Sequence, residues 1–141
     1  TELTGHVIVT LYVTSTEADG VFYVYLEDVG ERGEVTYVTD GHLRAMHRKV
    51  STEPPPYVSL VPYHTYKEKD AQPLVPGEVA EITFALQPTS VLVRKGHRLR
   101  IAIAGHDEGT FVRIPEEGTP EITVARNRVY ASFVDLPVVV G

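Results

Sequence analysis

Cysteine and tryptophan are both absent from this chain of 141 residues. Without cysteine no disulfide can hold the fold, so stability has to come from a hydrophobic core, and the 43% of apolar residues are enough to fill one. The length suits one domain spanning residues 1–141, since domains usually have about 100–200 residues. The lack of cysteine, with an N-terminus unlike a signal peptide, favours the cytoplasm over secretion.

Two classes of partner are disfavoured by what the chain lacks. No apolar run approaches the roughly 18 residues that a membrane-spanning helix needs, so no membrane partner is expected. Basic residues are in the minority, because 13 Lys and Arg stand against 19 Asp and Glu, which gives a net charge of −6. A nucleic-acid interface neutralises phosphates with a basic surface, so no nucleic-acid partner is expected either.

Helical periodicity is also nearly missing, whereas alternation of apolar and polar residues recurs. It runs with period two over residues 6–14, 21–28, 80–86 and 99–103, and Gly or Pro turns separate the runs. Short strands punctuated in this way predict an all-β fold, an antiparallel β-sandwich. The inward-facing members of the runs are predicted to be largely buried: Val7, Val9, Leu11, Phe22, Val24, Leu26, Ile82, Phe84, Leu99, Ile101 and Ile103.

One long stretch, residues 51–75, carries no strand pattern and is too rich in proline for a helix. Irregular segments of this length are usually functional, or pack as a belt over an otherwise exposed sheet. The charged run from Lys67 to Asp70 inside it is interpreted as solvated loop charge.

Catalytic motifs are absent. None of the serines lies in the Gly-x-Ser-x-Gly frame that exposes the nucleophile of an α/β-hydrolase, so no catalytic residue is assigned. The six histidines are scattered rather than clustered with carboxylates, so no metal site and no cofactor are expected.

Arg44 and Arg48 are four residues apart, which on a continuous strand puts both on one face. They are interpreted as structural, with stems covering the sheet and guanidinium groups bound to carbonyls or carboxylates. The alternative is that the two guanidinium groups together bind an anion or a carboxylate.

Several short sequence motifs of this chain occur together in one known family. They include Leu26-Glu27-Asp28-Val29, the run from Asp40-Gly41 to Arg48, the stretch from Arg94 to Asp107, and the closing Leu136-Pro137-Val138. In this order and spacing they resemble the C-terminal β-domain of the serine hydrolases typified by X-prolyl dipeptidyl aminopeptidase and cocaine esterase. The resemblance extends over nearly the whole chain.

The resemblance implies a jelly-roll β-sandwich of the galactose-binding type that carries no catalytic residue. It also implies that residues 1–141 are a fragment of a larger hydrolase, whose α/β-hydrolase catalytic domain, in the same polypeptide, is this domain's partner. There a serine would attack an ester or an X-Pro peptide bond, and the present domain would help to shape the substrate cleft. Nothing in the sequence chooses between ester and peptide.

Two segments are candidates for the contact with the catalytic domain or its cleft. One occupies the position of a family loop after the Gly-His-Arg strand; the other lies in the proline-rich loop, where aromatic rings with polar tips suit an interface. The candidate residues are Tyr63, His64, Tyr66, His106, Asp107, Phe111 and Arg113. Packing of either segment within its own domain is the alternative.

A different class of function stays open, because the jelly roll also serves as a carbohydrate-binding or interaction module. The chain has no Trp for a sugar platform, but eight Tyr are present. A homo-oligomer is open as well, since fold alone does not separate these roles.

Overall fold

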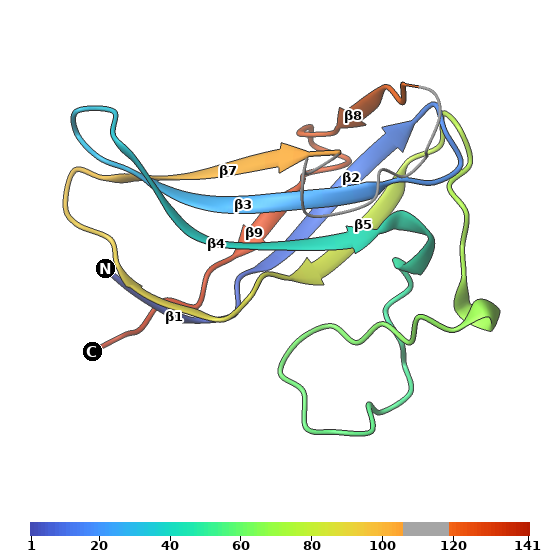
Figure 1. Cartoon of the computed structure of the whole chain (residues 1–141), viewed down its shortest axis with the longest axis horizontal. Coiled ribbons are helices and arrows are strands. Elements are labelled where there is room, and N and C mark those ends of the chain that lie inside the picture. The colour runs from blue at the N-terminus through green and yellow to red at the C-terminus, as the bar shows by residue number, and fades with distance from the viewer. Residues whose placement is uncertain (106–118) are drawn as a thin grey trace.

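Two antiparallel sheets face each other across an apolar layer (Figure 1). The structure is a computed structural model that describes residues 1–105 and 119–141. One sheet has the order β4-β3-β7, made of Val35–Arg44, Val21–Val29 and Arg98–Ala104. The other has β2 (Ile8–Ser15) at its centre, with β5 (Ala80–Ala85) on one side and β8 (Ile122–Val124) and β9 (Phe133–Asp135) on the other. The predicted all-β class and the sandwich are confirmed; the narrower jelly-roll label stays a prediction.

The outer edge of β2 is shared by two short strands. β9 pairs with the first part of β2, opposite Ile8 to Thr10, and β8 pairs with its last part, opposite Val13 to Ser15. Three residues each are too few to show a period, so the alternation in the sequence did not indicate these strands.

A small third sheet lies at one end of the sandwich. It pairs β1 (Glu2–Gly5) with β6 (Thr89–Leu92), and the C-terminal segment runs beside β1, since Thr4 donates to the carbonyl of Pro137 at 3.0 Å. Both ends of the chain therefore lie at the same end of the molecule (Figure 1).

The core is formed by the inward sides of the two main sheets, because side chains alternate between the faces of a strand. Eight of the eleven residues predicted as buried are buried, although on β3 the alternate residues Val21 and Tyr23 are buried as well. The eight are Val7, Val9, Leu11, Phe22, Val24, Leu26, Ile82 and Phe84.

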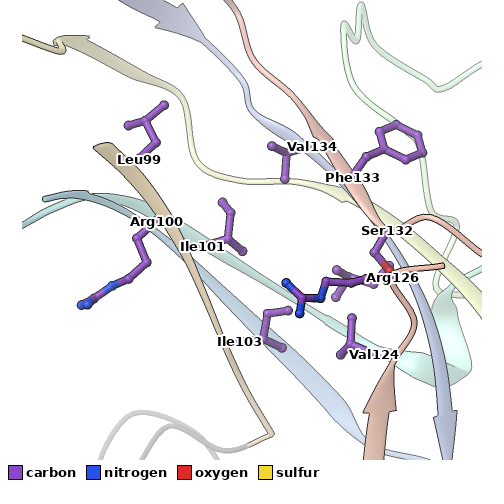
Figure 2. Close-up of a pocket in the computed structure, with 10 residues that line it drawn as sticks. Leu99, Arg100, Ile101, Ile103, Val124, Arg126, Ser132, Phe133 and Val134 are labelled. Carbon is purple, nitrogen blue, oxygen red and sulfur yellow. The ribbon is translucent and has the colours of Figure 1, made fainter. Parts of the chain in front are cut away.

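On β7 the predicted orientation of the side chains is confirmed, but the predicted extent of their burial is wrong. Ile101 lies opposite Leu26 and Ile103 opposite Val24, so both point to the inward side of the sheet. Leu99 and Ile101 are nevertheless only partly buried, and Ile103 is 39% exposed. The reason is that β7 is the last strand of its sheet within the described ranges, and a gap separates it from β8 and β9 (Figure 2).

Helix is confined, in the described part of the chain, to two 3-10 turns, Ala45–His47 and Glu68–Asp70, and neither is long and apolar enough to cross a membrane. The first turn corrects one expectation. β4 ends at Arg44, so Arg48 lies beyond the turn and does not share a strand face with it. The structural interpretation of both arginines holds: Arg44 pairs with Asp19 at 2.7 Å, and Arg48 binds backbone carbonyls.

Candidate interface loop

The base of the loop 51–75 is fastened by Arg48. Its guanidinium donates to the carbonyl of Ala45 at 3.1 Å and also to those of Gln72 and Pro73, which follow the second 3-10 turn. Partial burial lowers the pKa of Arg48, although a guanidinium stays charged at neutral pH. One side chain thus joins the start of the loop to its end.

The middle of the loop is fixed by His64, which is only 6% exposed. Its Nδ1 lies 3.2 Å from the carbonyl of Lys49 and its Nε2 lies 2.9 Å from the carbonyl of Thr83 on β5. A neutral imidazole donates from one nitrogen only, so the ring makes one conventional hydrogen bond in that state and two when it is protonated. In either case the ring sits between the loop and the sheet and holds the two together.

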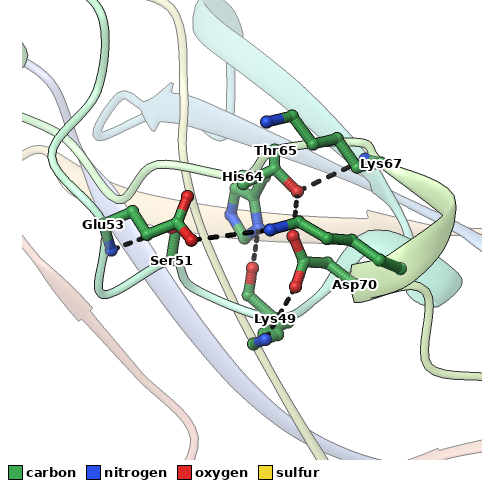
Figure 3. A network of polar contacts seen from close by, with 8 residues as sticks. Lys49, Ser51, Glu53, His64, Thr65, Lys67 and Asp70 are labelled. Atoms are coloured by element: carbon green, nitrogen blue, oxygen red, sulfur yellow. Dashed lines mark hydrogen bonds and ion pairs between the residues drawn. The ribbon is translucent and has the colours of Figure 1, made fainter.

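Around His64 a polar network ties neighbouring turns of the loop together (Figure 3). The Lys49 ammonium and the Thr65 hydroxyl both donate to the carboxylate of Asp70, each at 2.7 Å. These two hydrogen bonds lower the pKa of Asp70, and the carboxylate in turn raises the pKa of Lys49. The Asp70 carboxylate therefore forms an ion pair and a hydrogen bond, which corrects its interpretation as a solvated loop charge. Its partner Lys49 lies outside the charged run from Lys67 to Asp70, so the run did not predict this contact.

On this fastened base the loop exposes apolar and aromatic side chains. Val58 is 96% exposed, Leu60 is 91% exposed and Tyr66 is 62% exposed. Tyr63 is half-buried and meets Tyr57 edge-on at a centroid distance of 5.9 Å. These exposed side chains belong to a loop that Arg48 and Asp70 fasten at its base and that His64 joins to β5, so the scaffold can present them to a partner.

Tyr66 has a backbone that few residues adopt. Its φ is +56°, the left-handed region that costs a residue with a Cβ roughly 1 kcal/mol. Its ring tilts against His47 at a centroid distance of 5.1 Å, and partial burial, with Tyr57 nearby, raises the pKa of its hydroxyl. A strained residue of this kind persists where the surrounding contacts hold it, and such residues gather at functional sites.

Of the seven candidate residues, the structure brings together Tyr63, His64 and Tyr66. Tyr63 is half-buried and Tyr66 exposed, and the ring of the buried His64 lies 6.2 Å from that of Tyr66 between centroids. The other four, His106, Asp107, Phe111 and Arg113, are outside the described residues. Two residues of this region were not singled out as site residues from the sequence, Val58 and Leu60, although an apolar pair within a proline-rich stretch was a usable signal.

A nucleophilic site is not formed by the described residues. All five serines lie in the described ranges, and there no serine hydroxyl is hydrogen-bonded to a histidine. Three or more His, Cys, Asp or Glu side chains do not come together as a metal site within residues 1–105 and 119–141.

Comparison with known proteins adds relatives of much greater length. The chain is 56% identical over 138 residues to proteins named "Putative serine esterase" in Mycobacterium bovis and Mycobacterium tuberculosis. The match takes in 98% of this chain and 22% of each of those proteins. The chain therefore spans about a fifth of the length of these relatives.

Solved structures share the fold. A CocE/NonD family hydrolase from Staphylococcus aureus superimposes with a TM-score of 0.77 at 20% identity, over 98% of this chain and 28% of that one. An aminopeptidase from a marine sediment archaeon, Thaumarchaeota archaeon, gives a TM-score of 0.65 at 17% identity, over 96% of this chain and 23% of that one. Finally, the family model described as "X-Pro dipeptidyl-peptidase C-terminal non-catalytic domain" matches residues 1–132. Since that match spans nearly the whole chain, the protein belongs to the family of X-Pro dipeptidyl-peptidase C-terminal non-catalytic domains.

Proposed function

We propose that these 141 residues are one domain of a larger serine hydrolase, and that they pack against an α/β-hydrolase catalytic domain of the same polypeptide and help to shape its substrate cleft. The observation that carries the proposal is the family match over residues 1–132 of a chain that spans only 22% of its serine esterase relatives. The catalytic domain would supply the serine that attacks the substrate and forms an acyl-enzyme. The 56% identity to proteins named as esterases favours an ester over an X-Pro peptide as that substrate.

The docking face that we propose includes the exposed part of the loop 51–75. Val58 and Leu60 are almost fully exposed there, and apolar side chains presented together on a fastened loop are typical of a contact surface. Tyr63 and Tyr66 add aromatic rings, which are enriched at interfaces, while His64 joins this part of the loop to β5. The segment that contains His106, Asp107, Phe111 and Arg113 is proposed as the second part of this face.

Activity assays test the first half of the proposal. The 141-residue chain should not hydrolyse nitrophenyl esters or an X-Pro-nitroanilide, because it holds no Gly-x-Ser-x-Gly elbow. The full-length polypeptide should hydrolyse at least one of them. Turnover by the chain alone that survives repurification, and that is lost when one of its own residues is substituted, would contradict the proposal.

Kinetics of the full-length polypeptide test the docking face. Leu60→Ala and Tyr66→Ala should raise KM or lower kcat/KM there, since they remove apolar surface from the contact, and they should leave the thermal midpoint of the 141-residue chain nearly unchanged. Val129→Ala is the matched control, because Val129 is 79% exposed on the turn between β8 and β9. If Leu60→Ala and Tyr66→Ala behave like Val129→Ala in the full-length polypeptide, the loop does not dock.

A further inference from the structure

The sandwich is open along one side, between β7 and the pair β8 and β9. A cavity of about 580 Å³ lies there and opens to solvent. Protein interiors are packed nearly as densely as organic crystals, so an apolar space of this size between two sheets is unusual for a finished core. Figure 2 shows Leu99, Ile101 and Ile103 on one side of the gap and Val124, Phe133 and Val134 on the other.

Among the described residues, the strand that borders this cavity has one edge without a strand partner. β7 pairs with β3 on one side and has no strand neighbour on the other among the described residues. It spans seven residues, so within residues 1–105 and 119–141 one edge of it presents a row of N–H and C=O groups without a strand partner. A free edge beside an apolar groove offers both elements of strand addition, backbone hydrogen bonds and pockets for alternate side chains.

One cationic side chain, that of Arg126, lies at the rim of the cavity, although the chain as a whole has a net charge of −6. Arg126 and Arg100 both border it, but Figure 2 shows the Arg100 guanidinium pointing away from the gap, so the charge that faces the groove comes from Arg126. Arg100 is paired with Glu27 on the neighbouring strand, whereas Arg126 makes no ion pair with another described residue. Figure 2 shows the Arg126 guanidinium reaching into the gap on the side of Ile103. A carboxylate on the occupant of the groove would complement this charge.

We propose that the groove is filled by an extended segment of the same polypeptide from outside these 141 residues, added as a strand to the free edge of β7. Its inward apolar side chains lie between Ile101 and Ile103 on one side and Val124 and Val134 on the other, and one of its carboxylates faces Arg126. The inference rests on the proposed function, because it takes the chain to be part of a longer hydrolase. Most of each serine esterase relative lies outside the matched region, and a tethered segment binds at high effective concentration.

Engineered thiols and amide exchange test the inference in the longer polypeptide, with the 141-residue chain as reference. The chain has no cysteine, so Ile103→Cys in the groove, Val58→Cys on the loop 51–75 and Arg32→Cys on the exposed turn between β3 and β4 each add one reporter. Maleimide labelling is read peptide by peptide by mass spectrometry. Hydrogen exchange of a peptide spanning β7 reports on its backbone directly.

The inference predicts that Ile103→Cys is labelled roughly tenfold more slowly in the longer polypeptide than in the chain alone, that β7 amides exchange more slowly there, and that Arg32→Cys is unaffected. Equal labelling of Ile103→Cys in both proteins would overturn it. A protected Ile103→Cys thiol with unchanged exchange of the β7 amides would also overturn it, because whatever covers the groove would then not be a strand paired with β7. Protection that grows with protein concentration would overturn it as well, because the occupant would then be a second copy of the protein.

The loop reporter separates this inference from the proposed docking. Protection of Val58→Cys without protection of Ile103→Cys leaves the docking in place and overturns the added strand. Protection of Ile103→Cys alone supports the strand and contradicts docking through the loop. If the 141-residue chain does not fold alone, labelling of Ile103→Cys is compared with Arg32→Cys, and exchange of β7 with that of its paired neighbour β3, within the longer polypeptide.

Discussion

The imidazole of His97 lies 2.9 Å from the carboxylate of Asp28, Nδ1 to Oδ1, and joins the start of β7 to the end of β3. The two residues are 69 positions apart in sequence. Each comes from a phrase that the family shares, one from Leu26-Glu27-Asp28-Val29 and the other from Gly96-His97-Arg98. Gly96, with φ +84°, allows the tight turn that delivers His97 to this place. The contact gives these two phrases a common structural role at one end of the sheet.

Because both side chains are largely buried, removing either one leaves the other with an unsatisfied group. Asp28→Ala and His97→Ala should each lower the free energy of unfolding by about 1–2 kcal/mol. The double variant should lose about 1 kcal/mol less free energy of unfolding than the two single losses added together, because the interaction between the two side chains is lost only once. Urea unfolding of the four proteins measures this, and strictly additive losses would show that the contact contributes nothing.

Among the glycines that the structure describes, Gly41 should tolerate a side chain least, because backbone atoms surround it. A Cβ built on it would lie 2.9 Å from the carbonyl oxygen of Ala85 and 3.0 Å from the Cα of Leu86, both backbone atoms that cannot swing away. Gly41→Ala should therefore cost about 1–3 kcal/mol of unfolding free energy, as other overpacked sites do. Gly20→Ala is the control, because nothing lies within 4 Å of its Cβ position. Equal thermal midpoints for the two variants would refute the close approach of β4 to the end of β5.

The open side of the sandwich makes two inward-facing residues differ in their contribution. Leu26 is fully buried on β3, and Leu26→Ala should cost about 2–5 kcal/mol in the 141-residue chain, as for other core truncations. Ile103→Ala should cost less than half as much there, because the side chain is 39% exposed. Chemical unfolding of the two variants measures the difference, and equal losses would mean that the groove is closed in solution.

The contact between Asp70 and Lys49 should make the loop 51–75 sensitive to acid. The pKa of Asp70 is lowered on folding from its ordinary 3.8, so its contribution to stability is complete above that pH and is lost as the pH falls through the lower folded pKa. The pKa of Lys49 is raised from 10.5, so its contribution is complete below that pH and is lost as the pH rises through the higher folded pKa. Between these limits the loop stays fastened by this pair.

Limited proteolysis of the loop as a function of pH measures this effect. In Asp70→Asn, cleavage at neutral pH should rise and its increase toward acid pH should become smaller than in the unsubstituted chain. Glu68→Gln is the control, since Glu68 is exposed in the same 3-10 turn and makes no ion pair with a described residue. Cleavage in Asp70→Asn that matches Glu68→Gln at every pH would exclude a fastening role for this carboxylate.

By itself, the sequence determined the class of fold and the direction of its side chains. Alternation along residues 6–14, 21–28, 80–86 and 99–103 was enough for this, because a strand turns successive side chains to opposite faces whatever its neighbours are. The shared phrases were enough for the family, which the match over residues 1–132 confirmed. The alternation and the family motifs both lie in short stretches of sequence, so they can be recognised without the tertiary structure.

Only the tertiary structure decided how deeply each inward residue is buried and which polar groups meet. Ile103 alternates like Leu26, yet its exposure depends on the gap between β7 and the opposite sheet. In the sequence Asp70 does not differ from its charged neighbours, yet in the structure it forms an ion pair with Lys49, 21 residues away. Arg48 follows the spacing of a strand, yet a 3-10 turn takes it to the base of the loop. Burial and pairing are properties of residues far apart in the chain, and a local pattern cannot contain them.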